Sequence, residues 1–180
     1  MNLQFYLEKL FTSKEFENFK KENPDAYLCS GFVVIDNETK GKNANKVHLD
    51  YFIPSTKKMF SFQLEKDCEV VPVEHFSEEP PAKMLDNIDF EFEEIEKMIE
   101  EKMQKEGITS KIQKILLSLQ GKDKNHFLLG TVFISALGMI KIRIDLEDGH
   151  RSVYPQNRNS GAKMVDFEKK SLFDIIKRVK

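Results

Sequence analysis

The chain has 180 residues, of which 40% are hydrophobic and 32% are charged, and its formal net charge is −2. This composition is typical of a folded globular protein and excludes a largely disordered chain. No run of eighteen uncharged apolar residues occurs, and the N-terminus lacks the basic start and apolar run of a secretory signal, so we expect a cytoplasmic protein without a membrane segment.

The first 76 residues predict two short helices followed by strands. Leu3, Leu7 and Leu10 fall at helical spacing, and residues 12–15 form a capping box that starts a second helix before Pro24. Alternating or β-branched runs then predict four strands, over residues 26–36, 47–54, 60–64 and 68–74. A proline within the last run is typical of an edge strand.

The adjacent prolines Pro80 and Pro81 mark a linker, because neither can continue a helix or a central strand. Beyond the linker, Asp86 or Asp89 can cap a helix that ends at Gly107. The remaining chain predicts three strands, over residues 112–120, 126–136 and 139–147, and a hairpin into a further strand over residues 150–154. A polar loop over residues 156–163 and a short terminal helix over residues 171–180 complete the prediction.

Two segments of the chain resemble each other. Residues 52–65 recur, with a one-residue gap, as residues 133–145, and each copy follows a predicted helix. We therefore predict an α+β fold, a tandem duplication of a helix followed by a three- to four-stranded antiparallel sheet, with a short C-terminal helix. We expect a first helix-plus-sheet repeat over residues 1–76, a Pro-rich linker over residues 77–85 and a second helix-plus-sheet repeat over residues 86–154. Residues 155–180 are expected to form a basic loop and a C-terminal helix that packs on the repeats.

A helix backing a bent antiparallel sheet that ends in an alternating strand with an acidic residue and a following glycine, here residues 140–149, resembles the PepSY modules of the cystatin-like architecture. The resemblance covers residues 86–153 and, less well, residues 3–74. It implies a binding or inhibitory module of a kind commonly associated with peptidases and the cell envelope. A likeness of fold does not by itself fix a function.

Motifs for catalysis, cofactors and metals are missing from the sequence. There is no GxSxG, GxxxxGK or GxGxxG, so we expect no catalytic residue, cofactor or nucleotide. Cys29 and Cys68 have no CxxC context and are expected to be reduced thiols. His48 and Asp50 share a strand face at i, i+2, but two ligands do not make a metal site, and the Glu-rich stretch at 91–101 is interpreted as a solvated helix face.

The C-terminal segment is basic, with eight Lys and Arg against three Asp and Glu from residue 149 onward. Arg151, Arg158 and Lys163 are candidates for binding an anion or a partner. The alternative is a solvated loop followed by a docking helix. Nucleic acid is not the expected partner, because the whole chain is slightly acidic and has no recognised nucleic-acid motif.

Three functions follow from these observations. The leading hypothesis is a non-enzymatic module that binds a protein or peptide, or a second copy of itself, through sheet edges at residues 68–74 and 150–154 or through a concave sheet face. The first alternative is an enzyme or small-molecule binder with a pocket in the second half near His126, Asp145 and His150. The second alternative is phosphate or nucleic-acid binding by the basic segment.

Overall fold

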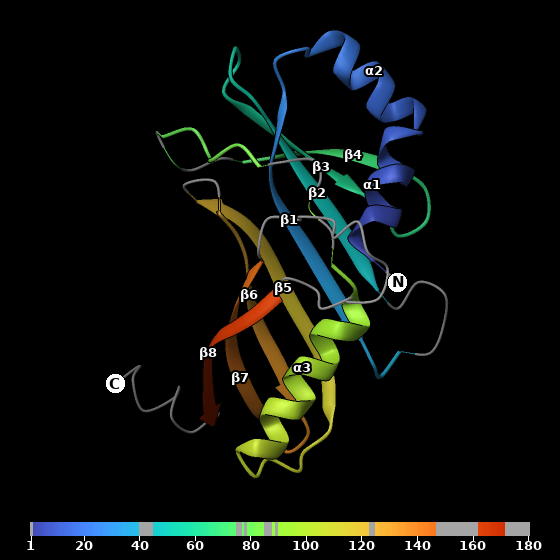
Figure 1. The fold of residues 1–180 in the computed structure, drawn as a ribbon. Helices are drawn as coiled ribbons and strands as arrows, with labels where there is room; N and C mark the ends of the chain where they lie inside the picture. The colour runs from blue at the N-terminus through green and yellow to red at the C-terminus, as the bar shows by residue number, and fades with distance from the viewer. Residues whose placement is uncertain are drawn as a thin grey trace, which may run out of the picture.

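The computed structural model describes residues 2–39, 45–74, 77, 79–84, 88, 90–122, 125–146 and 162–171. Two helices and four strands are followed by one helix and four further strands (Figure 1). Their bounds are α1 (Leu3–Phe11), α2 (Lys14–Glu22), β1 (Tyr27–Asp36), β2 (Lys46–Ile53), β3 (Lys58–Gln63), β4 (Glu69–Val73), α3 (Phe92–Lys105), β5 (Ile112–Lys122), β6 (Asn125–Ile134), β7 (Gly138–Leu146) and β8 (Ala162–Ser171).

Side-chain caps and charge order explain where the helices begin and end. The Ser13 side chain accepts a hydrogen bond from the Phe16 backbone N–H, which confirms the predicted restart of the chain as α2. Helix α3 has acidic residues in its first turn and lysines in its last, as the helix dipole favours, and Gly107 follows it with a φ of 69°. The predicted caps Asp86 and Asp89 lie outside the described residues.

All eight strands belong to one antiparallel sheet, in the order β4-β3-β2-β1-β5-β6-β7-β8. The expected tandem of separate three- to four-stranded sheets is therefore wrong. Strand β1 pairs with β5 through seven residue pairs from Ser30↔Gln120 to Asp36↔Lys114, so the sheet continues across the predicted linker. Alternation along a strand shows which residues share a face, but it does not identify the neighbouring strand. The two similar segments are both hairpins, β2–β3 and β6–β7.

The last described strand also differs from the prediction. Residues 162–171 form β8, where the sequence predicted the end of a loop and the start of a helix. A register shift opposite Arg143/Ile144 places Val165 as an extra residue between Met164 and Asp166. This bulge interrupts the alternation that would have predicted a strand. The predicted terminal helix otherwise lies outside the described residues, as does the predicted strand 150–154.

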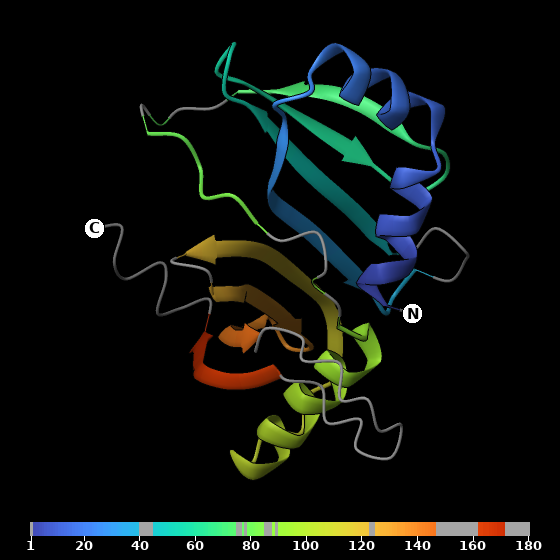
Figure 2. The ribbon, with the colours of Figure 1, turned by 45° about the horizontal axis from the view of Figure 1, so that its top comes forward.

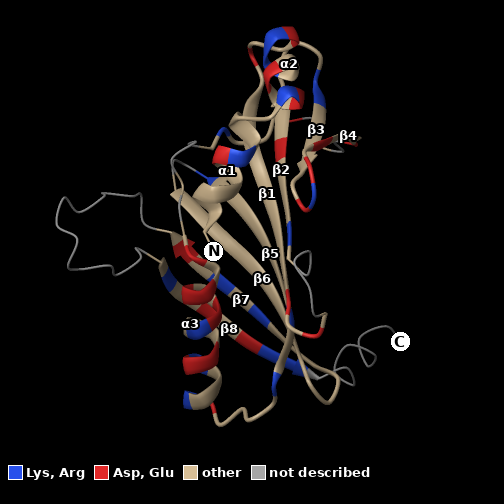
Figure 3. Ribbon diagram, turned by 90° about the vertical axis from the view of Figure 1, so that its right-hand side faces the viewer, with Lys and Arg blue, Asp and Glu red and all other residues tan. Residues whose placement is uncertain are grey.

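One core lies between the sheet and the three helices. Figures 2 and 3 show α1, α2 and α3 on the same side of the sheet, and their buried apolar side chains form a single cluster with residues from both ends of the sheet. The Pro-rich segment is tied to β1, because the Tyr27 hydroxyl donates to the Pro81 carbonyl oxygen at 2.7 Å and the Met84 N–H donates to the Leu28 carbonyl oxygen at 2.8 Å. The two ends of the sheet therefore share one hydrophobic core.

Candidate functional site

The candidate site is the sheet face opposite the helices, which we call the uncovered face because no described helix packs on it (Figure 3). Strand registers align its side chains into three adjacent rows that each cross β2, β1, β5, β6, β7 and β8 in that order. The first row is His48, Phe32, Ser118, Leu129, Arg143 and Asp166. The second is Lys46, Val34, Leu116, Thr131, Lys141 and Glu168, and the third is Asp50, Ser30, Gln120, Phe127, Asp145 and Lys163.

The middle of the uncovered face is apolar and indented. Phe32 is 36% exposed and Leu129 is 39% exposed, although water-facing positions of an antiparallel sheet are usually polar. The small side chains of Ser118 and Thr131 alternate with these large ones along the rows. A hollow of about 560 Å³ lies over these residues, and Leu116 also lines it.

Charged side chains of β7 and β8 line the other side of the hollow. Arg143 lies with its guanidinium carbon 4.4 Å from the centre of the Phe127 ring, and its Nε donates to the Asp145 carboxylate at 2.9 Å. These contacts hold Arg143 in one orientation. By contrast, Lys141 and Asp166 line the hollow without a hydrogen bond or ion pair to another described residue. Among the described residues, one cation and one anion at the hollow are thus left without an internal ion pair.

The β2 side of the face is a hydrogen-bonded polar zone. His48 Nε2 lies 2.6 Å from the Glu65 carboxylate, and the His48 ring also contacts the Phe32 ring, with centroids 6.2 Å apart. The Ser30 hydroxyl donates to the Asp50 carboxylate at 2.7 Å. His48 and Asp50 share this face, as their spacing predicted, but each contacts a different partner. The described residues contain no group of three potential metal ligands from His, Cys, Asp and Glu.

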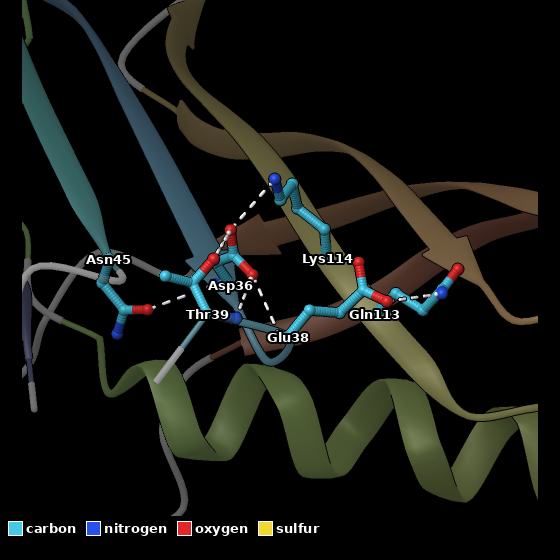
Figure 4. Close-up of polar contacts among 6 residues, drawn as sticks. All are labelled: Asp36, Glu38, Thr39, Asn45, Gln113 and Lys114. Carbon is cyan, nitrogen blue, oxygen red and sulfur yellow. Dashed lines mark hydrogen bonds and ion pairs between the residues drawn. The ribbon is translucent and has the colours of Figure 1, made fainter. Parts of the chain in front are cut away.

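A second polar cluster joins the turn after β1 to the start of β5 (Figure 4). The Asp36 carboxylate accepts from the backbone N–H groups of Glu38 and Thr39, both at 3.0 Å, and lies 3.0 Å from Lys114 Nζ. The Lys114 ammonium is the largest of the causes that lower the pKa of Asp36 to about 2, and the hydrogen bond from the Thr39 N–H comes next. Because these bonds already occupy the carboxylate, we interpret the cluster as structural.

The two edges of the described sheet are poorly suited to adding another strand. Strand β4 is an edge, as predicted, but Pro72 has no N–H to donate. The edge at the other end of the described strands is β8, and the edge predicted at residues 150–154 lies outside the described residues. In β8 the bulge at Val165 and several charged side chains disturb the ladder. These features favour the uncovered face over the edges as a binding surface.

The structure separates the residues proposed for a pocket. His126 is 3% exposed and pairs with Leu146 on the helix side, whereas Asp145 pairs with Phe127 on the uncovered face. The strand alternation therefore places His126 and Asp145 on opposite faces of the sheet. His150 lies outside the described residues.

The residues proposed for anion binding are only partly described. Lys163 is exposed on β8 opposite Asp145, while Arg151 and Arg158 lie outside the described residues. Both cysteines are free thiols. Burial raises the pKa of Cys29 to about 12, and its thiol lies 3.2 Å from the Asp50 carbonyl oxygen.

Sequence reasoning missed Phe32, Leu116, Leu129, Lys141 and Asp166 as site residues. A partial signal exists in the sequence, because β1 and β6 contain consecutive apolar residues where one solvated face would require alternation. The cross-strand rows depend on register and could not be found in this way.

Comparison with known proteins finds no match among family models, curated proteins or solved structures. Across the described residues, no helix combines the length and apolar character needed to span a membrane.

Proposed function

We propose that this protein is a non-enzymatic binding module that holds a protein or peptide on the uncovered face. The observation that carries the proposal is the apolar centre of three neighbouring strands, where Phe32, Leu116 and Leu129 surround a hollow of about 560 Å³. An apolar centre with a charged rim is the usual arrangement of a protein-binding surface. The partner is expected to place an apolar side chain in the hollow.

Charge at the rim supports a partner with both acidic and basic groups. Lys141 and Arg143 line the hollow on β7, and Asp166 and Glu168 line it on β8. The equal numbers of cations and anions provide no large field that would favour a polyanion such as nucleic acid. A polypeptide can supply an apolar side chain together with charges of either sign.

A random-peptide library displayed on phage tests the proposal. Panning against the full chain should enrich peptides whose binding to dilute protein, measured by fluorescence anisotropy, weakens about tenfold or more in Leu129→Ser, since truncating an anchor residue costs about 2 kcal/mol or more. Leu129 is exposed, so the substitution should leave the fold intact.

The matched control is Phe5→Ser on α1, where the side chain is 53% exposed and lies away from the uncovered face. Phe5→Ser should leave peptide affinity unchanged. Selected peptides that bind the wild type and Leu129→Ser equally would contradict the proposed function.

A further inference from the structure

Resting on the proposed function, we propose that the partner held by the uncovered face is a second copy of this chain, bound face to face. The evidence is the order of charges in the three rows. Strand β2 carries Lys46, His48 and Asp50, and β8 carries, in the same rows, the residues Glu168, Asp166 and Lys163. Lys46 and Asp50 thus each have a β8 residue of opposite charge in their own row, and His48 shares its row with Asp166.

A two-fold axis parallel to the strands, over the boundary between β5 and β6, brings these complementary groups together. Such an axis keeps every residue in its row, and places β5 against β6, β1 against β7 and β2 against β8 of the second copy. It sets Lys46 opposite the second copy's Glu168, and Asp50 opposite the second copy's Lys163. Because the operator is two-fold, each contact occurs twice.

The same axis matches several side chains of the inner strands by size and chemistry. On β5 and β6, Ser118 faces Leu129 and Leu116 faces Thr131, so in these two rows a large side chain meets a small one across the interface, while in the third row Gln120 faces Phe127. On β1 and β7, the Phe32 ring faces the Arg143 guanidinium, a pairing that is favourable for a cation and an aromatic ring. The indentation on one copy therefore receives the exposed leucine of the other.

Several charged groups on the flanks lack partners among the described residues of their own chain. Lys46, Lys163 and Asp166 form no hydrogen bond or ion pair with another described residue. The two-fold arrangement sets Lys46 opposite the second copy's Glu168, Lys163 opposite its Asp50, and Asp166 opposite its His48 ring. An in-plane axis perpendicular to the strands, over the row of Phe32 and Leu129, would instead place Arg143 over the second copy's Arg143 and Asp166 over the second copy's Asp166.

The available area is sufficient for a dimer of moderate stability. The face spans six neighbouring strands, β2, β1, β5, β6, β7 and β8, which lie about 4.8 Å apart. Three rows about 7 Å apart along these strands cover an area of roughly 600 Å². Standard interfaces bury about 800 Å² per partner, so we expect reversible association at micromolar concentrations. Two aligned sheets packed about 10 Å apart form a common sandwich arrangement.

A charge swap measured by sedimentation equilibrium tests the inference on the full chain. The wild type should show a monomer of 21.0 kDa in equilibrium with a species of twice that mass. Lys46→Glu and Glu168→Lys should each raise the dissociation constant about tenfold or more, because each places like charges together at two symmetric contacts. The double variant should return it to within about threefold of the wild type.

The controls make the same charge changes away from the face. Lys21→Glu on α2 and Glu101→Lys on α3, both on exposed side chains, should leave the dissociation constant unchanged. A chain that stays monomeric over the micromolar range would overturn the inference, as would a double variant no better than either single one. If the chain is monomeric while selected peptides still require Leu129, the second copy is excluded and the proposed function stands. A monomeric chain together with peptides that do not require Leu129 would reject both the second copy as partner and the proposed function.

Discussion

Gly130 on β6 is expected to be intolerant of a single added methyl group. A Cβ at this position would lie 2.5 Å from Cγ1 and 2.8 Å from Cδ1 of Ile142, and 2.9 Å from Cδ2 of Leu117. Carbon atoms in contact normally lie about 3.5–4.0 Å apart, so the neighbours would have to move by about 1 Å. Gly130, Ile142 and Leu117 pair in one row on the side of the sheet that faces the helices and the core.

The expected cost of Gly130→Ala follows from two opposing effects. Overpacking a core costs about 1–3 kcal/mol, and replacing Gly by Ala recovers about 0.4–1 kcal/mol by restricting the unfolded chain. The net loss in the free energy of unfolding should be about 1–2 kcal/mol, which corresponds to a fall in Tm of about 2–8 °C for a chain of this size. Urea unfolding followed by circular dichroism measures this loss directly.

A double-mutant cycle identifies the cause of the destabilisation. Ile142→Val removes the Cδ1 atom and should cost about 0.5–1.5 kcal/mol alone, but it relieves part of the contact with the methyl group that Gly130→Ala adds. The double variant should therefore lose at least about 0.5 kcal/mol less than the sum of the single variants. A Gly130→Ala protein as stable as the wild type, or strictly additive losses, would refute the steric explanation.

Three further predictions concern single residues. The folded-state pKa of Asp36 is lowered from 3.8 to about 2, so its contribution to stability is present above about pH 4 and is lost as the pH falls toward 2. Asp36→Asn should therefore flatten the acid side of the curve of unfolding free energy against pH. An unchanged acid slope in urea titrations would contradict this prediction. The buried Cys29 thiol, with a pKa of about 12, should react with iodoacetamide at pH 8 far more slowly than Cys68, as peptide mapping would show, and equal rates in the folded state would count against it. Gly107 has a φ of 69° with no atom within 4 Å of an added Cβ, so Gly107→Ala should cost about 1 kcal/mol in urea unfolding through backbone strain alone, and a gain in stability would contradict that explanation.

The sequence could predict most elements, because their signals are local. The capping box predicted at residues 12–15 located the start of α2 to within one residue, since the observed N-cap is Ser13, and this signal and the alternation of Ile140, Ile142 and Ile144 each depend on residues close in the chain. The two similar hairpins were recognisable for the same reason. Burial of one strand face produces the period-2 pattern wherever the strand lies in the sheet.

The arrangement of the sheet could not be predicted, because it depends on contacts between distant residues. Nothing local in β1 indicates that Ser30 pairs with Gln120, ninety positions later. In β8 the extra residue Val165 disrupts the periodicity on which a strand prediction relies. The residues of the candidate site were missed because the site depends on pairing between distant strands, and its rows exist only after six strands are placed in register.

The edges and the uncovered face present different opportunities for association. Addition of a strand needs a regular row of backbone donors and acceptors, and Pro72 in β4 and the Val165 bulge in β8 interrupt such a row at both ends of the described sheet. Self-pairing of β8 is also unfavourable, because an antiparallel register centred on Phe167 would place Asp166 opposite the second copy's Glu168. The uncovered face has no such obstacle and carries exposed Phe32 and Leu129, so side-chain packing on this face, rather than extension of the sheet, is the association that the arrangement of residues favours.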